Sequence, residues 1–181
     1  MKNNKKLQID EMGRKTLEEF RQSDKTPIVV VLDNIRSLNN VGSVFRTCDA
    51  MLIEKIVLCG ITACPPSQEI HKTALGAEDS VAWTYTESAI SAIEQLRTEG
   101  YIICSIEQAH ESVALQDFVF DPAKKHAIVM GNEVKGVQQE VVDKSDVCIE
   151  IPQYGTKHSF NVSVTTGIVL WEMFRQWKFG R

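Results

Sequence analysis

Residues Ile149 to Lys178 read IEIPQYGTKHSFNVSVTTGIVLWEMFRQWK, and this stretch decides the fold. It begins as a short apolar strand, breaks at Pro152 into a polar loop, and continues from Ser159 and Asn161 into a long apolar helix. A Ser or Asn before an apolar run is typical of a helix start, because its side chain accepts hydrogen bonds from N–H groups of the first turn. The stretch predicts a strand–loop–helix unit, which on its own is also typical of a plain connection.

The composition indicates a globular protein with one core. Of the 181 residues, 43% are hydrophobic and 24% are charged, which are ordinary values for a globular protein. This length favours a single domain. No apolar run reaches the roughly 18 residues of a membrane helix, and the charged N-terminus is not followed by a signal-peptide apolar region. We therefore expect a cytoplasmic protein.

Cysteine spacing and net charge argue against disulfide-rich, metal-binding and strongly basic classes of protein. The five cysteines are scattered without a CxxC pair, and the four histidines show no metal spacing. We expect buried, reduced thiols and no metal site. The net charge of −4 argues against a scaffold coated in Lys and Arg, although it allows a local basic face.

Apolar runs and helical patterns alternate along the chain. The expected strands are Ile28–Leu32, Lys55–Leu58, Val81–Tyr85, Tyr101–Ile106, Ala127–Met130 and Val147–Ile151. The expected helices are Ile9–Phe20, Val41–Met51, Glu69–Leu75, Glu87–Glu99 and Val137–Asp143, followed by the terminal helix, with Ala109–Pro122 as a mixed connection. This alternation predicts an α/β protein with a mostly parallel sheet and flanking helices. In such sheets ligands bind beyond the carboxyl ends of the strands.

The common cofactor motifs are missing. The sequence has no G-x-G-x-x-G fingerprint and no Ser-centred nucleophile elbow. Gly131 and Gly136 have P-loop spacing, but Val137 stands where the phosphate-binding Lys would be. The sequence therefore excludes a Walker A nucleotidase.

Three loops at the expected carboxyl edge of the sheet contain polar residues and glycines that are typical of a binding or catalytic site. The first, NVGSVFRT, combines Asn40 as a helix cap, Gly42 for close approach and Arg46 near the same helix end. The others are GNEVKG at Gly131–Gly136, and Ile151-Pro152 followed by SFNVS at Ser159–Ser163. Each alone has an ordinary interpretation: a surface arginine, a solvated turn, a strand-to-helix loop.

In this order and spacing, the three segments resemble the signature motifs of the SpoU/TrmH family, the ribose 2′-O-methyltransferases of the SPOUT superfamily. The likeness runs from about Ile28 to Glu172, and HKTALGAE at His71–Glu78 also looks like a family segment. The resemblance implies an α/β fold whose C-terminal part, from about Ala127, forms a deep trefoil knot. It also implies S-adenosylmethionine as cofactor, RNA (tRNA or rRNA) as substrate and a homodimer. Residues 28–181 would then be the catalytic domain, and 1–27 an N-terminal extension with a short helix.

The resemblance also assigns site residues. The implied catalytic residues are Asn40, Arg46, Glu133, Ser159 and Asn161. The implied cofactor-binding residues are Ile106, Glu107, Gly131, Asn132, Gly136, Ile151, Ser159 and Phe160. With too few residues before the first strand for an added RNA-binding domain, we expect RNA to contact Lys5, Lys6, Arg36, Arg46, Arg175 and Lys178.

Two points about the site are open from the sequence. Family accounts make Arg46 the activator of the 2′-hydroxyl, whereas a guanidinium stays protonated and suits a phosphate or a developing alkoxide. His158 is a weaker candidate base at a variable loop position. Gln153 and Phe160 stand where family members often carry Met and Leu, which leaves the shape of the adenine pocket open.

Two other functions are open as well. One is a knotted RNA-binding protein without turnover, which the complete motif set argues against. The other is base methylation by a SPOUT enzyme, whereas the Asn40–Arg46 motif favours the ribose. The terminal helix carries Trp171, Phe174 and Trp177, and so much aromatic surface predicts a symmetric dimer interface.

Overall fold

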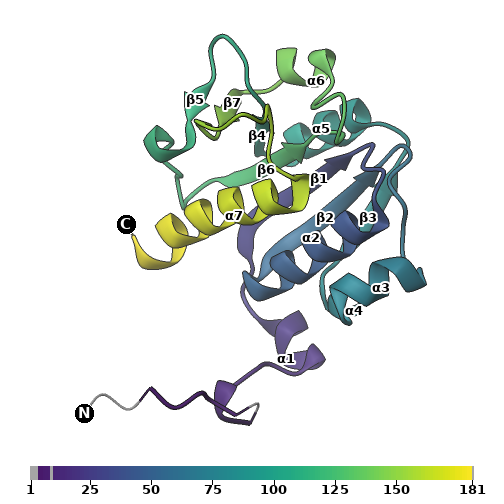
Figure 1. Cartoon of the computed structure of the whole chain (residues 1–181), viewed down its shortest axis with the longest axis vertical. Coiled ribbons are helices and arrows are strands. Elements are labelled where there is room, and N and C mark those ends of the chain that lie inside the picture. Colours follow the sequence, from purple (N-terminus) through teal and green to yellow (C-terminus); the bar gives the residue numbers. More distant parts are fainter. Residues whose placement is uncertain (1–3, 9, 181) are drawn as a thin grey trace.

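The computed structural model describes residues 4–8 and 10–180, which fold around one parallel sheet covered by helices on both faces (Figure 1). The sheet order is β3-β2-β1-β6-β4-β7-β5, and every pairing is parallel. Its strands are β1 Thr26–Asp33, β2 Ile53–Cys59, β3 Trp83–Thr86, β4 Tyr101–Ile106, β5 Val113–Ala114, β6 Lys125–Met130 and β7 Val147–Glu150. The predicted α/β class is confirmed.

Two apolar layers hold the helices against the sheet. The helices are α1 Leu17–Gln22, α2 Leu38–Ala50, α3 Gln68–Ala74, α4 Ala77–Ser80, α5 Ala89–Thr98, α6 Gln139–Asp143 and α7 Val162–Phe179. One buried cluster joins α2, α3, α4 and α7 to one face of the sheet, and a second joins α5 and α6 to the other face. Both clusters draw on the fully buried run 28–32 of β1, so this strand is central to the molecule, as a β-branched run predicts.

Side-chain caps set where the main helices begin. Ser37, Ser67 and Ser88 each accept a hydrogen bond from an N–H of the first turn of α2, α3 and α5. The expected cap at Asn40 is therefore wrong: α2 begins three residues earlier than predicted, and Asn40 lies in its first turn, where its N–H donates to Ser37. Asn161 caps α7, where its side chain accepts from the Ser163 N–H, and this confirms the helix start predicted from the sequence.

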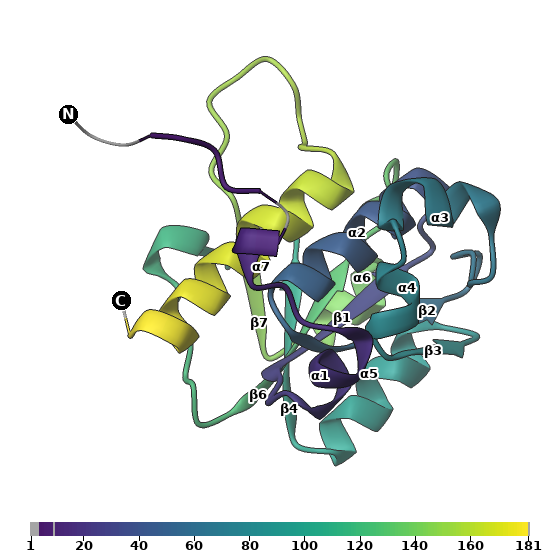
Figure 2. The same ribbon diagram turned by 90° about the horizontal axis from the view of Figure 1, so that it is seen from below.

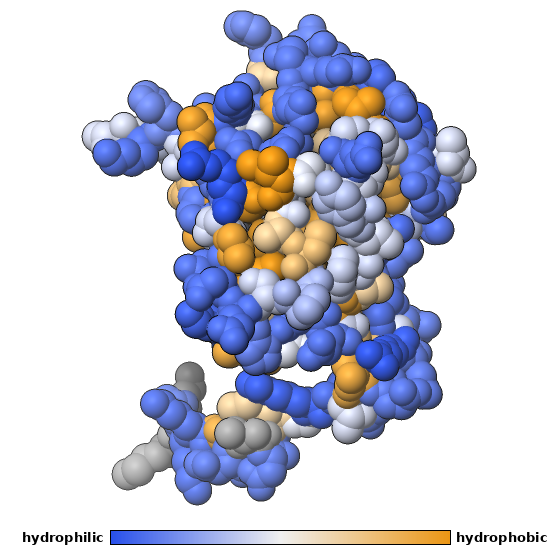
Figure 3. Space-filling view, turned by 90° about the vertical axis from the view of Figure 1, so that its right-hand side faces the viewer, coloured by the Kyte–Doolittle hydropathy of each residue, from blue (hydrophilic) through white to orange (hydrophobic). Residues whose placement is uncertain are grey.

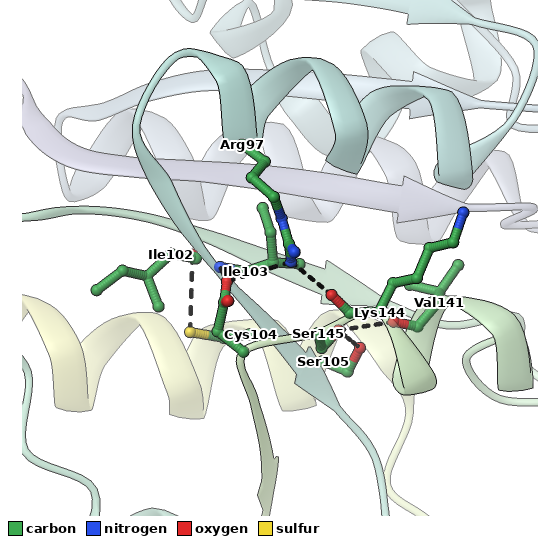
Figure 4. Close-up of polar contacts among 9 residues, drawn as sticks. Arg97, Ile102, Ile103, Cys104, Ser105, Val141, Lys144 and Ser145 are labelled. Atoms are coloured by element: carbon green, nitrogen blue, oxygen red, sulfur yellow. Dashed lines mark hydrogen bonds and ion pairs between the residues drawn. The ribbon is translucent and has the colours of Figure 1, made fainter.

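The turn between α6 and β7 is fixed to its neighbours by polar contacts (Figure 4). Arg97 of α5 donates to the Lys144 carbonyl at 2.5 Å, and the hydroxyls of Ser105 and Ser145 lie 2.6 Å apart. The Asp146 carboxylate accepts the Ile103 N–H of β4 at 2.7 Å. These bonds position β7 and therefore the start of the loop that follows it.

The structure corrects several element predictions. Residues 9–20 are not one helix: a 3-10 turn at Asp10–Met12 and the separate α1 replace it, and residue 9 lies outside the described residues. The sheet has seven described strands rather than about six, because β5 forms inside the expected connection. Helix α4 follows Leu75, whose left-handed backbone ends α3. Figure 3 shows the N-terminal segment as a narrow, mostly hydrophilic lobe below the body.

The expectations drawn from composition have mixed outcomes. All five cysteines are free, but only Cys48, Cys59 and Cys104 are buried, while Cys64 and Cys148 are half-buried. Burial raises the pKa of the Cys59 and Cys104 thiols to about 12, so both are uncharged. Within the described part of the chain, no helix is long and apolar enough to cross a bilayer. The trefoil knot and the division at residue 27 stay predictions.

Candidate functional site

A cleft of about 690 Å³ lies at the carboxyl ends of β4, β6 and β7. Ile106, Met130 and Ile149 are its apolar residues from these strand ends, and the loops 131–137 and 151–161 form its walls. The cleft lies where a parallel α/β sheet binds ligands. All eight residues expected to bind a cofactor line it, so the structure brings that whole set together.

The turn 131–136 needs its two glycines for contacts within the protein. Asn132 and Gly136 exchange backbone hydrogen bonds of 3.0 and 2.9 Å. A Cβ on Gly131 would lie 2.1 Å from the Val137 nitrogen, and one on Gly136, whose φ is +69°, would lie 2.1 Å from a Glu107 carboxylate oxygen. The close approach expected at Gly131 is therefore, in this structure, that of the folded-back loop itself.

Glu107 and Gln108 tie the cleft walls to the end of β4. The Glu107 carboxylate accepts the Val137 N–H at 2.9 Å and the Gln108 N–H at 2.8 Å. The Gln108 side chain donates to the His158 carbonyl at 2.9 Å and so holds the loop 151–161, the long arch beside the start of α7 in Figure 2. Sequence reasoning missed Gln108, whose only signal is its place two residues after a buried strand.

Glu133 connects the first two motif loops. Its carboxylate accepts the Arg36 and Ser37 N–H groups at 2.9 and 3.0 Å and the Asn40 amide at 3.0 Å. These donors lie at the start of α2, where a negative charge is favoured. Burial raises the pKa of Glu133, but the hydrogen bonds outweigh it and hold the pKa below its usual value. An ionised, fully engaged carboxylate suits positioning better than proton transfer.

Asn161 joins the third motif to this arrangement. Its amide donates to the Asn40 side-chain oxygen at 3.1 Å, while its own oxygen accepts from the Ser163 N–H at 2.9 Å. We call the connected set Glu133, Asn40 and Asn161 the three-loop network. Through it, residues separated by about ninety to more than a hundred positions in sequence fix the mouth of one cleft.

The remaining expected catalytic residues lie in different places. Ser159 is exposed and lines the cleft, as does His158. Arg46 is exposed on the third turn of α2 and does not line the cleft; it lies in a second groove beside Lys72 and Thr73 of α3. Within one chain, the structure therefore joins four of the five expected catalytic residues around the cleft and places Arg46 apart from them.

The expected RNA-binding residues are spread over the surface. Lys5 and Lys6 are exposed on the N-terminal segment, and Arg36 is exposed at the start of α2. On α7, Arg175 forms an ion pair with Glu172 and Lys178 lies over the Trp177 ring at 5.5 Å. Arg175 is already neutralised within the protein, so its predicted role in RNA binding has the weakest structural basis.

The cleft fits S-adenosylmethionine in size and in chemistry. Its volume lies within the usual range of small-molecule sites, roughly 300–1,000 Å³. Strand-end apolar residues and the half-exposed Phe160 suit the adenine, while the Glu107 and Glu150 carboxylates suit a ligand with positive charge. These features belong to the residues themselves and to their arrangement at the strand ends.

A parallel α/β sheet whose strand-end cleft is walled by two of the motif loops and linked to the third through Asn40 is the arrangement expected of a SPOUT methyltransferase. More specifically, the chain belongs to the SpoU rRNA Methylase family, whose sequence profile matches residues 27–171. The match spans all three motif loops and both walls of the cleft, so the family resemblance inferred from the sequence is confirmed.

The names of similar proteins are consistent with this family. A tRNA (guanosine(18)-2′-O)-methyltransferase of Aquifex aeolicus is 32% identical over 90% of this chain and 75% of its own length. The crystal structure of the A. aeolicus TrmH/SpoU tRNA modifying enzyme superposes with a TM-score of 0.80 at 28% identity, over 91% of this chain and 82% of that one. An AdoMet-bound rRNA methyltransferase from Sinorhizobium meliloti gives 0.76 at 28% identity, over 87% and 59%. The chain spans only 64% of a Staphylococcus haemolyticus relative.

Proposed function

We propose that this chain transfers the methyl group of S-adenosylmethionine to a ribose 2′-hydroxyl of tRNA or rRNA at the cleft described above. Family membership supports the reaction, and the names of the relatives support both the cofactor and the RNA substrate. The observation that carries the proposal is the three-loop network, because it joins all three motifs at the mouth of one cleft.

In this proposal one group of residues binds the cofactor and another positions the groups at the reaction site. Bound S-adenosylmethionine supplies a methyl group on a positively charged sulfur. The strand ends and the turn 131–136 hold the cofactor, while Ser159 and Asn161 border the opening where the ribose enters. Glu133 and Asn40 keep Asn161 in place, and such positioning is a large part of the catalysis of a group transfer. Arg46 acts on the RNA as a fixed positive charge.

We also propose that the active form is a homodimer that works in the cytoplasm, where tRNA and rRNA are substrates. Trp171, Phe179 and Val164 of α7 are each at least half exposed, and Phe174 connects the Trp171, Trp177 and Phe179 rings by aromatic contacts. An exposed apolar helix of this kind is typical of an interface. Light scattering at micromolar concentration should give twice the chain mass, and a monomer would contradict the dimer.

Two measurements test the reaction itself. Calorimetry with chelator present should show S-adenosylmethionine and its demethylated product binding to the purified protein. Unmodified tRNA and rRNA transcripts should then gain 2′-O-methyl nucleosides, identified by digestion and mass spectrometry. Methyl on a base would indicate the base methyltransferase instead, and RNA binding without transfer would indicate the binding protein. Methylation profiling in cells that lack the protein would name the RNA and the nucleotide.

A further inference from the structure

Residues 151–161, which we call the arch, project from the body of the protein beside the start of α7 (Figure 2). The residues 154–161 are all exposed. Among the described residues, the bond from the Gln108 side chain to the His158 carbonyl is the single hydrogen bond that residues 152–160 make. The tip of the arch therefore extends into solvent next to the opening of the cofactor cleft.

Tyr154 at this tip is the most exposed large apolar side chain in the described part of the chain, at 96%. Tyrosine rings are usually at least partly covered, because burying an aromatic ring is strongly favourable. Its neighbour Gln153 and the second aromatic residue of the arch, Phe160, both line the cleft, whereas Tyr154 does not. The Tyr154 ring thus lies outside the cofactor site, directly beside a residue that lines it.

The composition around this ring suits RNA better than an apolar protein surface. Between Glu150 and Glu172 the sequence has no acidic residue, although the net charge of the chain is −4. The tip, QYGTKH, combines one aromatic ring with Lys157 and has no aliphatic side chain that would extend the ring into an apolar patch. A Cβ on Gly155 would meet nothing within 4 Å, so the chain directly after the ring is unpacked. An aromatic ring beside a cation is typical of sites that bind unpaired nucleotides.

We infer that the Tyr154 ring stacks on a nucleobase of the unpaired RNA segment that contains the target ribose. The inference rests on the proposed function and extends it, because it adds a base-contacting residue to a site otherwise built around the ribose and the cofactor.

The reaction itself calls for such a stacking partner. A ribose that enters the cleft must leave the regular path of the RNA strand, and its base or a neighbouring base then loses stacking on the adjacent bases. An aromatic side chain restores that stacking without reading the sequence. Tyr154 is placed to do so, since it lies five residues before Ser159 at the opening of the cleft, a span of at most about 17 Å.

A series of substitutions at Tyr154 tests the stacking, with unmodified tRNA and rRNA transcripts as substrates. Tyr154→Ala should raise the KM for RNA about tenfold, because the stack contributes to RNA binding. Tyr154→Phe and Tyr154→Trp should keep the KM within about twofold of the wild type, since stacking needs the ring and not the hydroxyl. Calorimetry should give an unchanged S-adenosylmethionine affinity in all three variants, because Tyr154 does not line the cleft.

Tyr85→Ala is the matched control. Tyr85 is also an exposed tyrosine, at 51%, but it lies on the edge strand β3, away from β4, β6 and β7 in the sheet order. Its replacement should leave the KM for RNA unchanged. The salt dependence of RNA binding should keep its wild-type slope in Tyr154→Ala, since the substitution removes no charge.

Three results would overturn the stacking while leaving the proposed function in place: a wild type that methylates RNA with Tyr154→Ala at the KM of Tyr85→Ala, a KM in Tyr154→Phe as high as in Tyr154→Ala, or a lower mass of Tyr154→Ala in light scattering. The second would mean that the hydroxyl makes the contact, and the third that the ring belongs to an interface between copies of the chain. Wild-type protein that binds neither S-adenosylmethionine nor RNA would overturn the proposed function, and the stacking with it.

Discussion

The first and third turns of α2 differ in how the protein partners their polar side chains. At the first turn, Asn40 is held between Glu133 and Asn161, and the N–H groups of residues 36 and 37 are all engaged. At the third turn, Arg46 is exposed and makes no hydrogen bond or ion pair with the described residues. The polar side chain of the first turn is therefore held by hydrogen bonds within the protein, whereas the charge of the third turn is exposed to solvent. We call these the closed and the open end of this part of α2.

This difference separates what the fold provides from what the substrate must provide. A network of hydrogen bonds within the protein is ordered before any ligand arrives, and such preorganisation lowers the cost of positioning reactants. An unpaired cation gains its partner only when an anion binds. The comparison predicts that changes at the first turn affect folding and cofactor binding, whereas changes at the third turn affect RNA and transfer.

The largest effect is expected at the open end. Arg46→Ala should lower methyl transfer about a hundredfold, as for the loss of one electrostatic stabiliser. S-adenosylmethionine affinity should be nearly unchanged, because Arg46 does not line the cleft. Arg46→Lys should rescue poorly, since an ammonium lacks the planar fork of the guanidinium. Single-turnover assays with saturating RNA measure this, and a wild-type rate for Arg46→Ala would show that the proposed site is wrong.

The next largest effect is expected from a packing change at Gly42, which lies between Asn40 and Arg46 on α2. Gly42→Ala places a methyl group against the Ile70 carbonyl, and such overpacking should cost about 1–3 kcal/mol of unfolding free energy. Gly167→Ala is the control, because a Cβ there meets nothing within 4 Å. It should raise helix stability by about 0.5–1 kcal/mol. Thermal unfolding of both variants separates the two, and equal shifts would contradict the packing role of Gly42.

The sequence predicted the framework because its signals are local. The apolar run 28–32 must be buried on both faces, and polar loops after such strands gather at one edge of a parallel sheet. The cap at Asn161 is equally local. Strand β5 was not predicted because it has only two residues, Val113 and Ala114, which give no sequence pattern. It is defined by its pairing with β7.

The site was less predictable because its decisive contacts join distant residues. The resemblance placed Glu133, Asn40 and Asn161 in one site, but nothing in the sequence shows that Glu133 accepts two backbone N–H groups of another loop. Spacing along α2 suggested that Arg46 lies near the same helix end as Asn40. Six residues turn a helix by about 240°, so the two side chains face different grooves.

A smaller effect is expected within the closed network. Asn161→Ala removes both the cap of α7 and the bond to Asn40, so it should cost about 1 kcal/mol of unfolding free energy and weaken both cofactor binding and transfer. Asn161→Asp keeps the capping oxygen but loses the amide that donates to Asn40. It should therefore retain most of the stability while still losing transfer. Denaturant unfolding measures the stability and single-turnover assays measure the transfer. A stability loss in Asn161→Asp equal to that in Asn161→Ala would contradict separate roles for the capping oxygen and the Asn40 bond.

The smallest expected effect is the acid dependence that Glu133 contributes. Its pKa in the folded protein lies below the ordinary value of 4.5, because hydrogen bonds from the Arg36 and Ser37 N–H groups outweigh its burial. A carboxyl group with a lowered folded pKa contributes stability above its unfolded pKa and loses it as the pH falls through the folded one. The wild type should thus lose stability below about pH 4.5 more steeply than Glu133→Gln, which has no carboxylate to protonate.

The comparison between these two proteins isolates Glu133 from other carboxyl groups with lowered pKa values, such as Glu78 and Glu172, because both proteins contain them. At pH 7 the variant should be less stable, since a carboxamide offers one acceptor oxygen where the carboxylate uses both. The two unfolding free energies should converge on acidification. Parallel curves between pH 7 and pH 3 would mean that the Glu133 charge does not hold the start of α2, and the closed end of the helix would then owe its order to packing alone.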